Sequence, residues 1–283
     1  MRSFGIYTNL QKDPGLVITK SVVELLEKHE VACYLDEEAA SALGLSENTE
    51  GKRLDVLLVL GGDGTMLAAA RKYAKTGVLL FGVNLGRLGF LLDAQLSELE
   101  DALSRILAGQ YEVQERMMLI ASVLPENGGE ERVLGYALNE AVVSSRDILR
   151  ILDAEVRVND KEVGAFRCDG IIVSTPTGST GYSLSAGGPV VEPTAEMLII
   201  TPICPHSLQS NSYVVGGRDS AYVRLRREGE KGAVMLDGQE YFEFGPNEQV
   251  HLRKADVRAG FLKTMDQNFF ALLKEKLAEW SAK

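Results

Sequence analysis

The chain has 283 residues, of which 45% are hydrophobic and 25% charged, a composition typical of a globular protein with one large or two ordinary domains. Its formal net charge of −10 argues against a broad basic surface, so we expect no nucleic acid among its partners. Three widely spaced cysteines, an N-terminus without the apolar core of a signal peptide and the lack of a bilayer-length apolar run predict a cytoplasmic protein without membrane attachment.

Strand and helix patterns alternate in the first part of the chain. Apolar runs typical of strands occupy 3–8, 31–35, 55–60 and 78–84, and apolar residues at helical spacing occupy 16–30, 65–75 and 96–109. We expect Ser97 to be the N-cap of the last of these helices. Such alternation predicts a parallel sheet covered on both faces, and we place this Rossmann-like α/β domain at residues 1–112.

The pattern changes after Tyr111 to short apolar runs separated by glycine, asparagine, aspartate and proline turns. The strands that we expect there occupy 116–124, 133–145, 151–160, 161–175, 212–217, 220–227 and 232–239. They predict a β-rich, β-sandwich-like domain at 113–262. Helical spacing returns at 266–280, so we expect residues 263–283 to form a C-terminal helix that packs back on the first domain.

The most informative segment is VLLVLGGDGTMLAAAR at residues 56–71, a buried strand that passes through a glycine turn into a helix. Such a turn gathers backbone N–H groups at a helix N-terminus, which favours phosphate. Asp63 would repel phosphate unless it holds a metal ion or accepts a proton from an attacking hydroxyl. The alternative is an ordinary junction in which Asp63 caps the helix; no Walker A lysine or GxGxxG spacing is present. The expected phosphate-binding residues are Gly61, Gly62, Gly64 and Thr65.

Two shorter motifs are ambiguous when each is taken by itself. Gly82, Gly86 and Gly89 lie at and just past the end of the strand expected at 78–84, where ligand loops lie in open α/β sheets. Phe90 beside them either stacks on a base or belongs to the core. The pair Asn139–Glu140 either contacts a ligand at the mouth of a strand or marks a solvated strand end.

The segment from Arg167 to Pro193 is the densest polar stretch, yet no charged residue occurs between Gly170 and Val191. Small hydroxyl residues and glycines close to the backbone are typical of a loop that lines a ligand cleft, and a purely structural loop is the weaker alternative. A serine nucleophile is weaker still, because the segment lacks the G-x-S-x-G elbow.

Taken together, these motifs resemble the NAD kinase family. They are GGDGT at 61–65, NLGRLGF at 84–90, NE at 139–140, DGIIVSTPTGSTGYSLSAGGP at 169–189 and TPICPHSL at 201–208. GGDGT is shared with diacylglycerol and sphingosine kinases and with phosphofructokinases, whereas the pair and the hydroxyl-rich segment are far more specific. The family usually has alanine where this chain has Gly181, a change expected to loosen the loop slightly.

The resemblance implies a homo-oligomer, a dimer or tetramer, that transfers the γ-phosphoryl group of ATP to the 2′-hydroxyl of the adenosine ribose of NAD. Asp63 matches the proton acceptor, and Mg²⁺ is expected to enter with ATP rather than at a site built by the protein alone. The pair at 139–140 matches residues that hold the adenosine. The positions that match NAD-binding residues are Asp63, Gly64, Phe90, Asn139, Glu140, Arg150, Arg167, Asp169, Thr180, Gly181, Tyr182, Ser185 and Gln239.

Two other functions remain alternatives. A lipid kinase that shares only GGDGT would need an apolar acceptor pocket and attraction to membranes, which the hydroxyl-rich segment and the acidic balance disfavour. A dinucleotide-binding sensor without catalysis is disfavoured by the intact Asp63.

Overall fold

The computed structural model describes residues 3–86, 89–147, 150–206, 211–265 and 268–281. The chain forms two compact units, one made of Met1–Glu115 with Ala259–Lys283 and the other of Arg116–Arg258. The expected combination of an N-terminal α/β domain, a β-rich domain and a C-terminal helix is confirmed. In the described part of the chain, no helix is long and apolar enough to span a membrane.

The first unit is built on parallel strands flanked by helices. Its strands are β1 (Ser3–Thr8), β2 (Ala32–Leu35), β3 (Val56–Gly61), β4 (Leu79–Asn84) and β5 (Ala94–Gln95). They pair in the order β2-β1-β3-β4, with β5 also on β4. Every residue of β3 is buried, as expected for a central strand with both faces covered.

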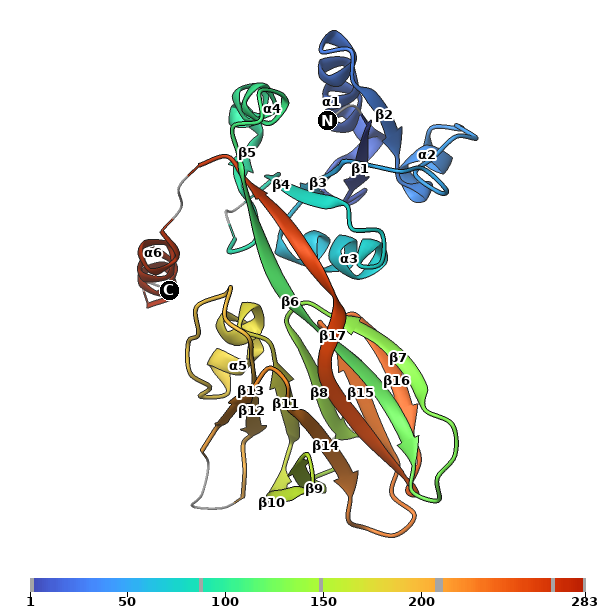
Figure 1. Ribbon diagram of the computed structural model, residues 1–283, viewed down its shortest axis with the longest axis vertical. Helices are drawn as coiled ribbons and strands as arrows, with labels where there is room; N and C mark the ends of the chain where they lie inside the picture. The colour runs from blue at the N-terminus through green and yellow to red at the C-terminus, as the bar shows by residue number, and fades with distance from the viewer. Residues whose placement is uncertain (1–2, 87–88, 148–149, 207–210, 266–267, 282–283) are drawn as a thin grey trace. The chain divides into compact units, whose positions relative to one another are not determined.

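Helices cover both faces of this sheet, with α3 on one side and α1 and α4 on the other (Figure 1). The helices are α1 (Val17–Lys28), α2 (Glu37–Ala42), α3 (Asp63–Tyr73) and α4 (Leu99–Leu107), with short 3-10 turns η1 (Pro14–Leu16) and η2 (Leu96–Glu98). On one face, Val56, Leu58 and Leu60 of β3 belong to the same core as Leu26 of α1 and Leu103 of α4.

The predicted cap at Ser97 is wrong. The turn η2 precedes α4, and Glu98 bridges back so that its Oε2 accepts a hydrogen bond from the backbone N–H of Gln95 at 2.8 Å. Helix α2 was not predicted, because it is too short to show apolar periodicity. Asp36 caps it by accepting the N–H of Glu38 at 3.2 Å.

The last strand of the chain contributes to the first unit. Strand β17 (Glu248–Lys263) pairs with β4 through Gly260 and Phe261, and Leu262 lies in the core of that unit. Just beyond it, the N–H and hydroxyl of Thr264 donate to Oδ2 of the buried Asp93 at 3.0 and 2.8 Å. The following helix α6 (Phe269–Ser281) contributes no side chain to this core among the residues described, so its predicted packing on the first domain stays a prediction.

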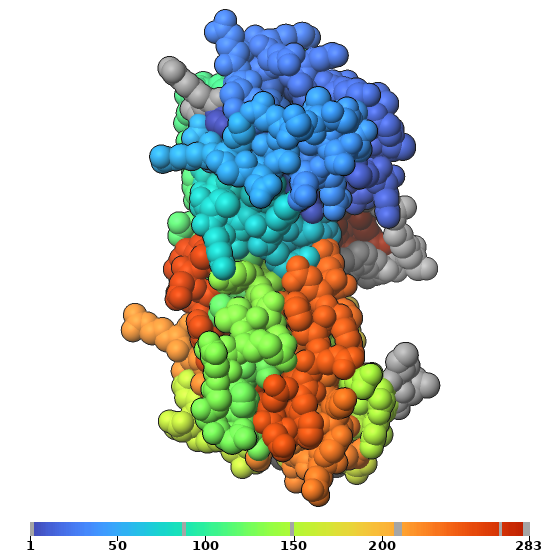
Figure 2. Space-filling view, turned by 90° about the vertical axis from the view of Figure 1, so that its right-hand side faces the viewer, coloured from blue at the N-terminus to red at the C-terminus, as the bar shows by residue number. Residues whose placement is uncertain are grey.

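The second unit is an antiparallel β structure. One sheet has the order β13-β12-β11-β8-β15-β16, and a second group of strands pairs as β10-β9-β14-β17, with β6 on β17 and β7 on β6. Side chains from both sets share one core, including Val143 and Ile171 from the first and Val156 and Leu252 from the second. On the face shown in Figure 2, the green segment with β6 and β7 lies beside the orange-to-red segment with β15 to β17.

The strands of this unit divide more finely than the sequence predicts. They are β6 (Glu112–Pro125), β7 (Arg132–Ala137), β8 (Glu140–Ser145), β9 (Leu152–Val158), β10 (Lys161–Cys168), β11 (Gly170–Ser174), β12 (Met197–Ile203), β13 (Tyr213–Gly216), β14 (Ser220–Leu225), β15 (Gly232–Leu236) and β16 (Glu240–Phe244). The strand expected at 133–145 breaks before Glu140, and the one expected at 161–175 breaks at Asp169. Three strands, β12, β16 and β17, were not predicted.

Candidate active site

The GGDGT turn joins β3 to α3 in the first unit. Gly62 is the N-cap of α3 with an extended backbone, and its N–H lies 3.4 Å from the hydroxyl of Thr65. A Cβ on Gly61 would overlap the Thr65 side chain, so the tight turn requires glycine there. The same hydroxyl lies 3.2 Å from Nδ2 of Asn9, which donates to it. Thr65 therefore links the turn to the loop that follows β1.

Asp63 does not cap its own helix. Its carboxylate accepts hydrogen bonds from the backbone N–H groups of Phe90 at 2.9 Å and Leu91 at 3.1 Å. A Cβ on Gly89 would overlap this carboxylate, so only glycine allows the 89–91 loop to approach so closely. An ionised carboxylate has about four acceptor positions. The two amides orient Asp63 and leave acceptor capacity for a hydroxyl, as a general base requires.

A lysine that sequence patterns did not indicate, Lys12, lies at the same turn. The Lys12 ammonium is 2.5 Å from the position that a Cβ on Gly62 would take. Its loop is ordered by Asn9, whose Oδ1 accepts the N–H groups of Gln11 at 3.0 Å and Lys12 at 3.1 Å. The available signal was topological, because β1 and β3 are parallel neighbours and their carboxyl ends meet at one edge of the sheet.

The Asn139–Glu140 pair of the second unit lies at the break between β7 and β8, where Asp237 holds its backbone. One oxygen of the Asp237 carboxylate, Oδ1, accepts the N–H groups of Asn139 at 2.8 Å and Glu140 at 3.1 Å, and Oδ2 accepts that of Leu138 at 3.0 Å. Thr175 engages the carbonyls: its hydroxyl donates to Leu138 at 2.6 Å and its N–H to Asn139 at 2.8 Å. The pair is therefore fixed from two directions.

Several buried polar atoms gather around this pair. Among the residues described, Oδ1 of Asn139, Oε2 of Glu140, Oγ of Ser174 and Oγ1 of Thr177 are buried without a hydrogen-bond partner. Ser174 lies directly opposite Glu140 in the pairing of β11 with β8. Because buried polar groups are nearly always hydrogen-bonded, a cluster of four unsatisfied atoms indicates a site for a polar ligand.

Glu140 has an unusual electrostatic environment. Burial, assisted by the negative charge of Asp237, raises the pKa of its carboxyl from 4.5 to about 8. Near neutral pH the side chain therefore carries a proton and acts as both hydrogen-bond donor and acceptor. This capability suits a ligand with hydroxyl groups.

The hydroxyl-rich segment forms the 3-10 turn η3 (Thr177–Thr180) and the single-turn helix α5 (Tyr182–Ser185). The structure brings two glycines of this region to the pair: a Cβ on Gly178 would overlap the Asn139 carbonyl, and one on Gly181 would lie 3.3 Å from Oε2 of Glu140. Thr180 is buried, whereas the other two predicted ligand positions, Tyr182 and Ser185, are exposed.

The remaining predicted positions in the second unit form ion pairs or are exposed. Arg150 forms ion pairs with Asp147 at 3.1 Å and Glu230 at 3.8 Å. Arg167 and Asp169 are exposed at the junction of β10 and β11, and Gln239 is exposed after the turn that follows β15. The motifs at 84–90 and 201–208 include residues 87–88 and 207–208, which lie outside the described part of the chain.

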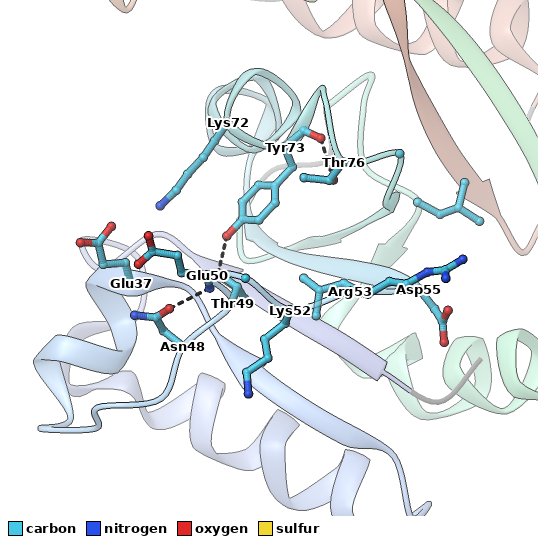
Figure 3. Close-up of a pocket in the computed structure, with 14 residues that line it drawn as sticks. Glu37, Asn48, Thr49, Glu50, Lys52, Arg53, Asp55, Lys72, Tyr73 and Thr76 are labelled. Carbon is cyan, nitrogen blue, oxygen red and sulfur yellow. Dashed lines mark hydrogen bonds between the residues drawn. The ribbon is translucent and has the colours of Figure 1, made fainter.

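A separate pocket of about 940 Å³ occurs at the other end of the first unit's strands (Figure 3). Its lining includes Asp55, which precedes β3, and Leu79, which begins β4, whereas GGDGT starts at Gly61, the last residue of β3. Within it, the hydroxyls of Thr49 and Tyr73 are hydrogen-bonded at 2.7 Å. None of the predicted site residues lines this pocket. In the described part of the chain, no group of three potential metal ligands occurs.

Comparison with known proteins places these features in a family. The ATP-NAD kinase N-terminal domain matches residues 17–111, and the ATP-NAD kinase C-terminal domain matches residues 138–264. An NAD kinase of Caldanaerobacter subterraneus subsp. tengcongensis is 40% identical, with 99% of this chain and 100% of the relative aligned. An NAD kinase of Desulforamulus reducens is 38% identical over 99% of this chain and 98% of its own.

Solved structures agree with this assignment. An NAD kinase from Archaeoglobus fulgidus in complex with ATP is 31% identical, with a TM-score of 0.75 over 98% of this chain and 99% of its own. A yeast NADH kinase complexed with NADH has a TM-score of 0.85 over 98% of this chain and 88% of its own; at 18% identity it shows the shared fold. The chain is therefore a phosphotransferase. More narrowly, it belongs to the NAD kinase family.

Proposed function

We propose that this protein transfers the γ-phosphoryl group of ATP to the 2′-hydroxyl of the adenosine ribose of NAD, giving NADP and ADP. The observation that carries the chemistry is the oriented carboxylate of Asp63 beside a turn suited to phosphate. Solved family members in complex with ATP and NADH support these substrates.

In the proposed reaction, Asp63 is the general base. It accepts the proton of the 2′-hydroxyl as the ribose oxygen bonds to the γ-phosphorus, and the bond from that phosphorus to the oxygen of ADP breaks. A hydroxyl is a poor nucleophile, so a positioned base contributes about 10²- to 10⁴-fold to the rate. The two backbone amides that hold Asp63 support this role by fixing its direction before substrate binds.

The donor phosphates need positive charge and N–H groups. We assign phosphate binding to the turn residues Gly61, Gly62, Gly64 and Thr65. Mg²⁺ bound to the ATP substrate would neutralise part of the phosphate charge. We add Lys12 to these phosphate-binding residues. Its ammonium beside Gly62 supplies the positive charge that a Walker A lysine supplies in other phosphate sites.

The acceptor is held by the Asn139–Glu140 pair, whose unpartnered buried oxygens support contact with the adenosine of NAD. The family resemblance assigns Phe90, Thr180 and Ser185 to the adenine. It assigns the rest of the dinucleotide to Asp169, Gly181 and Tyr182, with Gly64, Arg150, Arg167 and Gln239 as further NAD-binding positions.

We also propose the setting in which the enzyme works. The domains are 1–112, 113–262 and the C-terminal helix at 263–283, and the protein acts in the cytoplasm as a homo-oligomer, a dimer or a homotetramer. Support for a reducing compartment comes from Cys33, Cys168 and Cys204, all free thiols. Size-exclusion chromatography with light scattering tests the oligomer.

The deciding experiment incubates the protein with Mg-ATP and NAD and follows NADP formation. Absence of NADP with every metal and phosphoryl donor tried would refute the proposal. Diacylglycerol offered as acceptor tests the lipid-kinase alternative, and NAD binding without turnover would favour a sensor.

A further inference from the structure

Asp237 occupies the tip of the hairpin that joins β15 to β16. Both central residues of this turn have positive φ, 49° at Asp237 and 67° at Gly238, and the N–H of Gln239 donates to the carbonyl of Leu236 at 2.9 Å. This is the type I′ geometry that favours Asp-Gly in two-residue hairpin turns. A turn residue of this kind usually lies on the surface, and its carboxylate usually bonds to its own neighbours.

The carboxylate of Asp237 does something different. The residue is only 6% exposed, and its carboxylate accepts the consecutive N–H groups of Leu138, Asn139 and Glu140, nearly a hundred positions earlier in the chain. The N–H of Asp237 in turn donates to the Glu140 carbonyl at 2.9 Å. Burying a carboxylate near a second one is costly, and three N–H donors offset that cost.

We propose that Asp237 is a positioning residue for NAD recognition: its carboxylate fixes the Asn139–Glu140 backbone so that both side chains face the dinucleotide. The proposal rests on the proposed function only for the identity of the ligand. Together with Thr175, Asp237 satisfies every backbone N–H and carbonyl from Leu138 to Glu140. Only the side chains of the pair, with the unpartnered oxygens Oδ1 of Asn139 and Oε2 of Glu140, are therefore left to form hydrogen bonds with a ligand.

Two substitutions of Asp237 distinguish its hydrogen bonds to the Asn139–Glu140 backbone from its part in forming the hairpin turn. Asp237→Gly keeps a residue that favours positive φ and removes the carboxylate, whereas Asp237→Asn keeps the turn and one acceptor oxygen. Asp219→Asn is the matched control, because the Asp219 carboxylate also accepts a backbone N–H, that of Gly216 at 2.9 Å, at a surface turn in the same unit.

The first measurement is steady-state kinetics with each substrate varied. Loss of charge-assisted hydrogen bonds predicts that the KM for NAD rises about tenfold or more in Asp237→Gly and less in Asp237→Asn. The KM for ATP should change less than about twofold, since the donor contacts lie elsewhere, and Asp219→Asn should match the wild type. Equal rises in both KM values, or an unchanged KM for NAD in folded Asp237→Gly, would overturn the proposal.

The second measurement needs no catalysis. Amide hydrogen exchange by NMR should be at least about tenfold faster at Leu138, Asn139 and Glu140 in Asp237→Gly, with the β9 amides unchanged. Unchanged exchange at the three amides would refute the positioning role. Absence of NADP formation by the wild-type protein would refute the proposed function instead, and the exchange result would still decide whether Asp237 holds the pair.

Discussion

The two candidate regions, the GGDGT turn of the first unit and the Asn139–Glu140 pair of the second, are built on opposite principles. At the GGDGT turn, backbone amides hold the half-buried carboxylate of Asp63, and the Lys12 side chain lies beside Gly62. Around Asn139–Glu140, the backbone is fully engaged and buried side-chain oxygens lack partners. The first arrangement suits charge that moves during a reaction, whereas the second suits recognition of a neutral ligand surface.

The sharpest test of this contrast is Asp63→Asn. If the turn performs the chemistry, the variant should bind NAD normally while kcat falls by about 10²- to 10⁴-fold, because the base is lost and the acceptor contacts remain. Asp55→Asn is the control, since Asp55 precedes β3 and so lies at the end of that strand opposite to the turn. Steady-state kinetics and NAD titration calorimetry measure both quantities, and an unchanged kcat would remove Asp63 from the mechanism.

For the turn proposed to bind the phosphates of ATP, we expect a smaller effect from substitution of Lys12. Lys12→Met should raise the KM for ATP by about tenfold or more and leave the KM for NAD unchanged, because one charge-assisted contact to phosphate is lost. Lys20→Met, which removes an exposed lysine of α1, serves as the control. A variant that loses affinity for NAD and not for ATP would reverse the assignment of the two regions.

For the Asn139–Glu140 pair, we expect the free energy of unfolding of the protein to depend on pH. The pKa of Glu140 is about 8 in the folded protein and near 4.5 when unfolded, so the folded state keeps a proton that the unfolded chain releases. The contribution of Glu140 to the free energy of unfolding is therefore fully present below about pH 4.5. It declines by up to about 1.4 kcal/mol per pH unit as the pH rises to 8. Glu140→Gln should remove this slope in urea unfolding between pH 6 and 8. Glu24→Gln, on an exposed helix face, should retain it.

The smallest expected effect concerns Gly181, where the family usually has alanine. A Cβ there would lie 3.3 Å from Oε2 of Glu140, a close contact that a shift of a few tenths of an ångström relieves. Gly181→Ala should therefore change the KM for NAD less than about threefold, in line with mild overpacking. Gly178→Ala makes a stringent comparison, because its Cβ would overlap the Asn139 carbonyl. Similar KM values for NAD in both variants would contradict this expectation, because they would show that the Asn139–Glu140 pair can move without loss of NAD binding.

Sequence patterns were informative where the chemistry is local. The strand, glycine turn and helix around Asp63 follow one another in the chain, so periodicity and turn composition were enough to predict the α/β domain and the glycine turn between β3 and α3. The hydroxyl-rich segment was recognisable because it lacks charge over a long stretch.

Partners that are distant in the chain were not predictable in this way. Asp237 meets Asn139 across 98 residues, and Lys12 meets Gly62 through the pairing of β1 with β3. Their local sequences indicate only a hairpin turn and a polar loop. Strands β12 and β17 were missed for a related reason: they have no simple alternation, and β17 runs on through both compact units.

The shared strand β17 has a consequence for synthesis. The first unit contains most of the N-terminal residues, yet Gly260, Phe261 and Leu262 complete its sheet edge and core, and Thr264 satisfies the buried Asp93. A nascent chain leaving the ribosome therefore cannot finish its first unit until nearly the whole protein has been translated. Messages truncated before codon 259 should produce chains in which the GGDGT-bearing unit lacks its closing strand, a form that proteases should degrade readily.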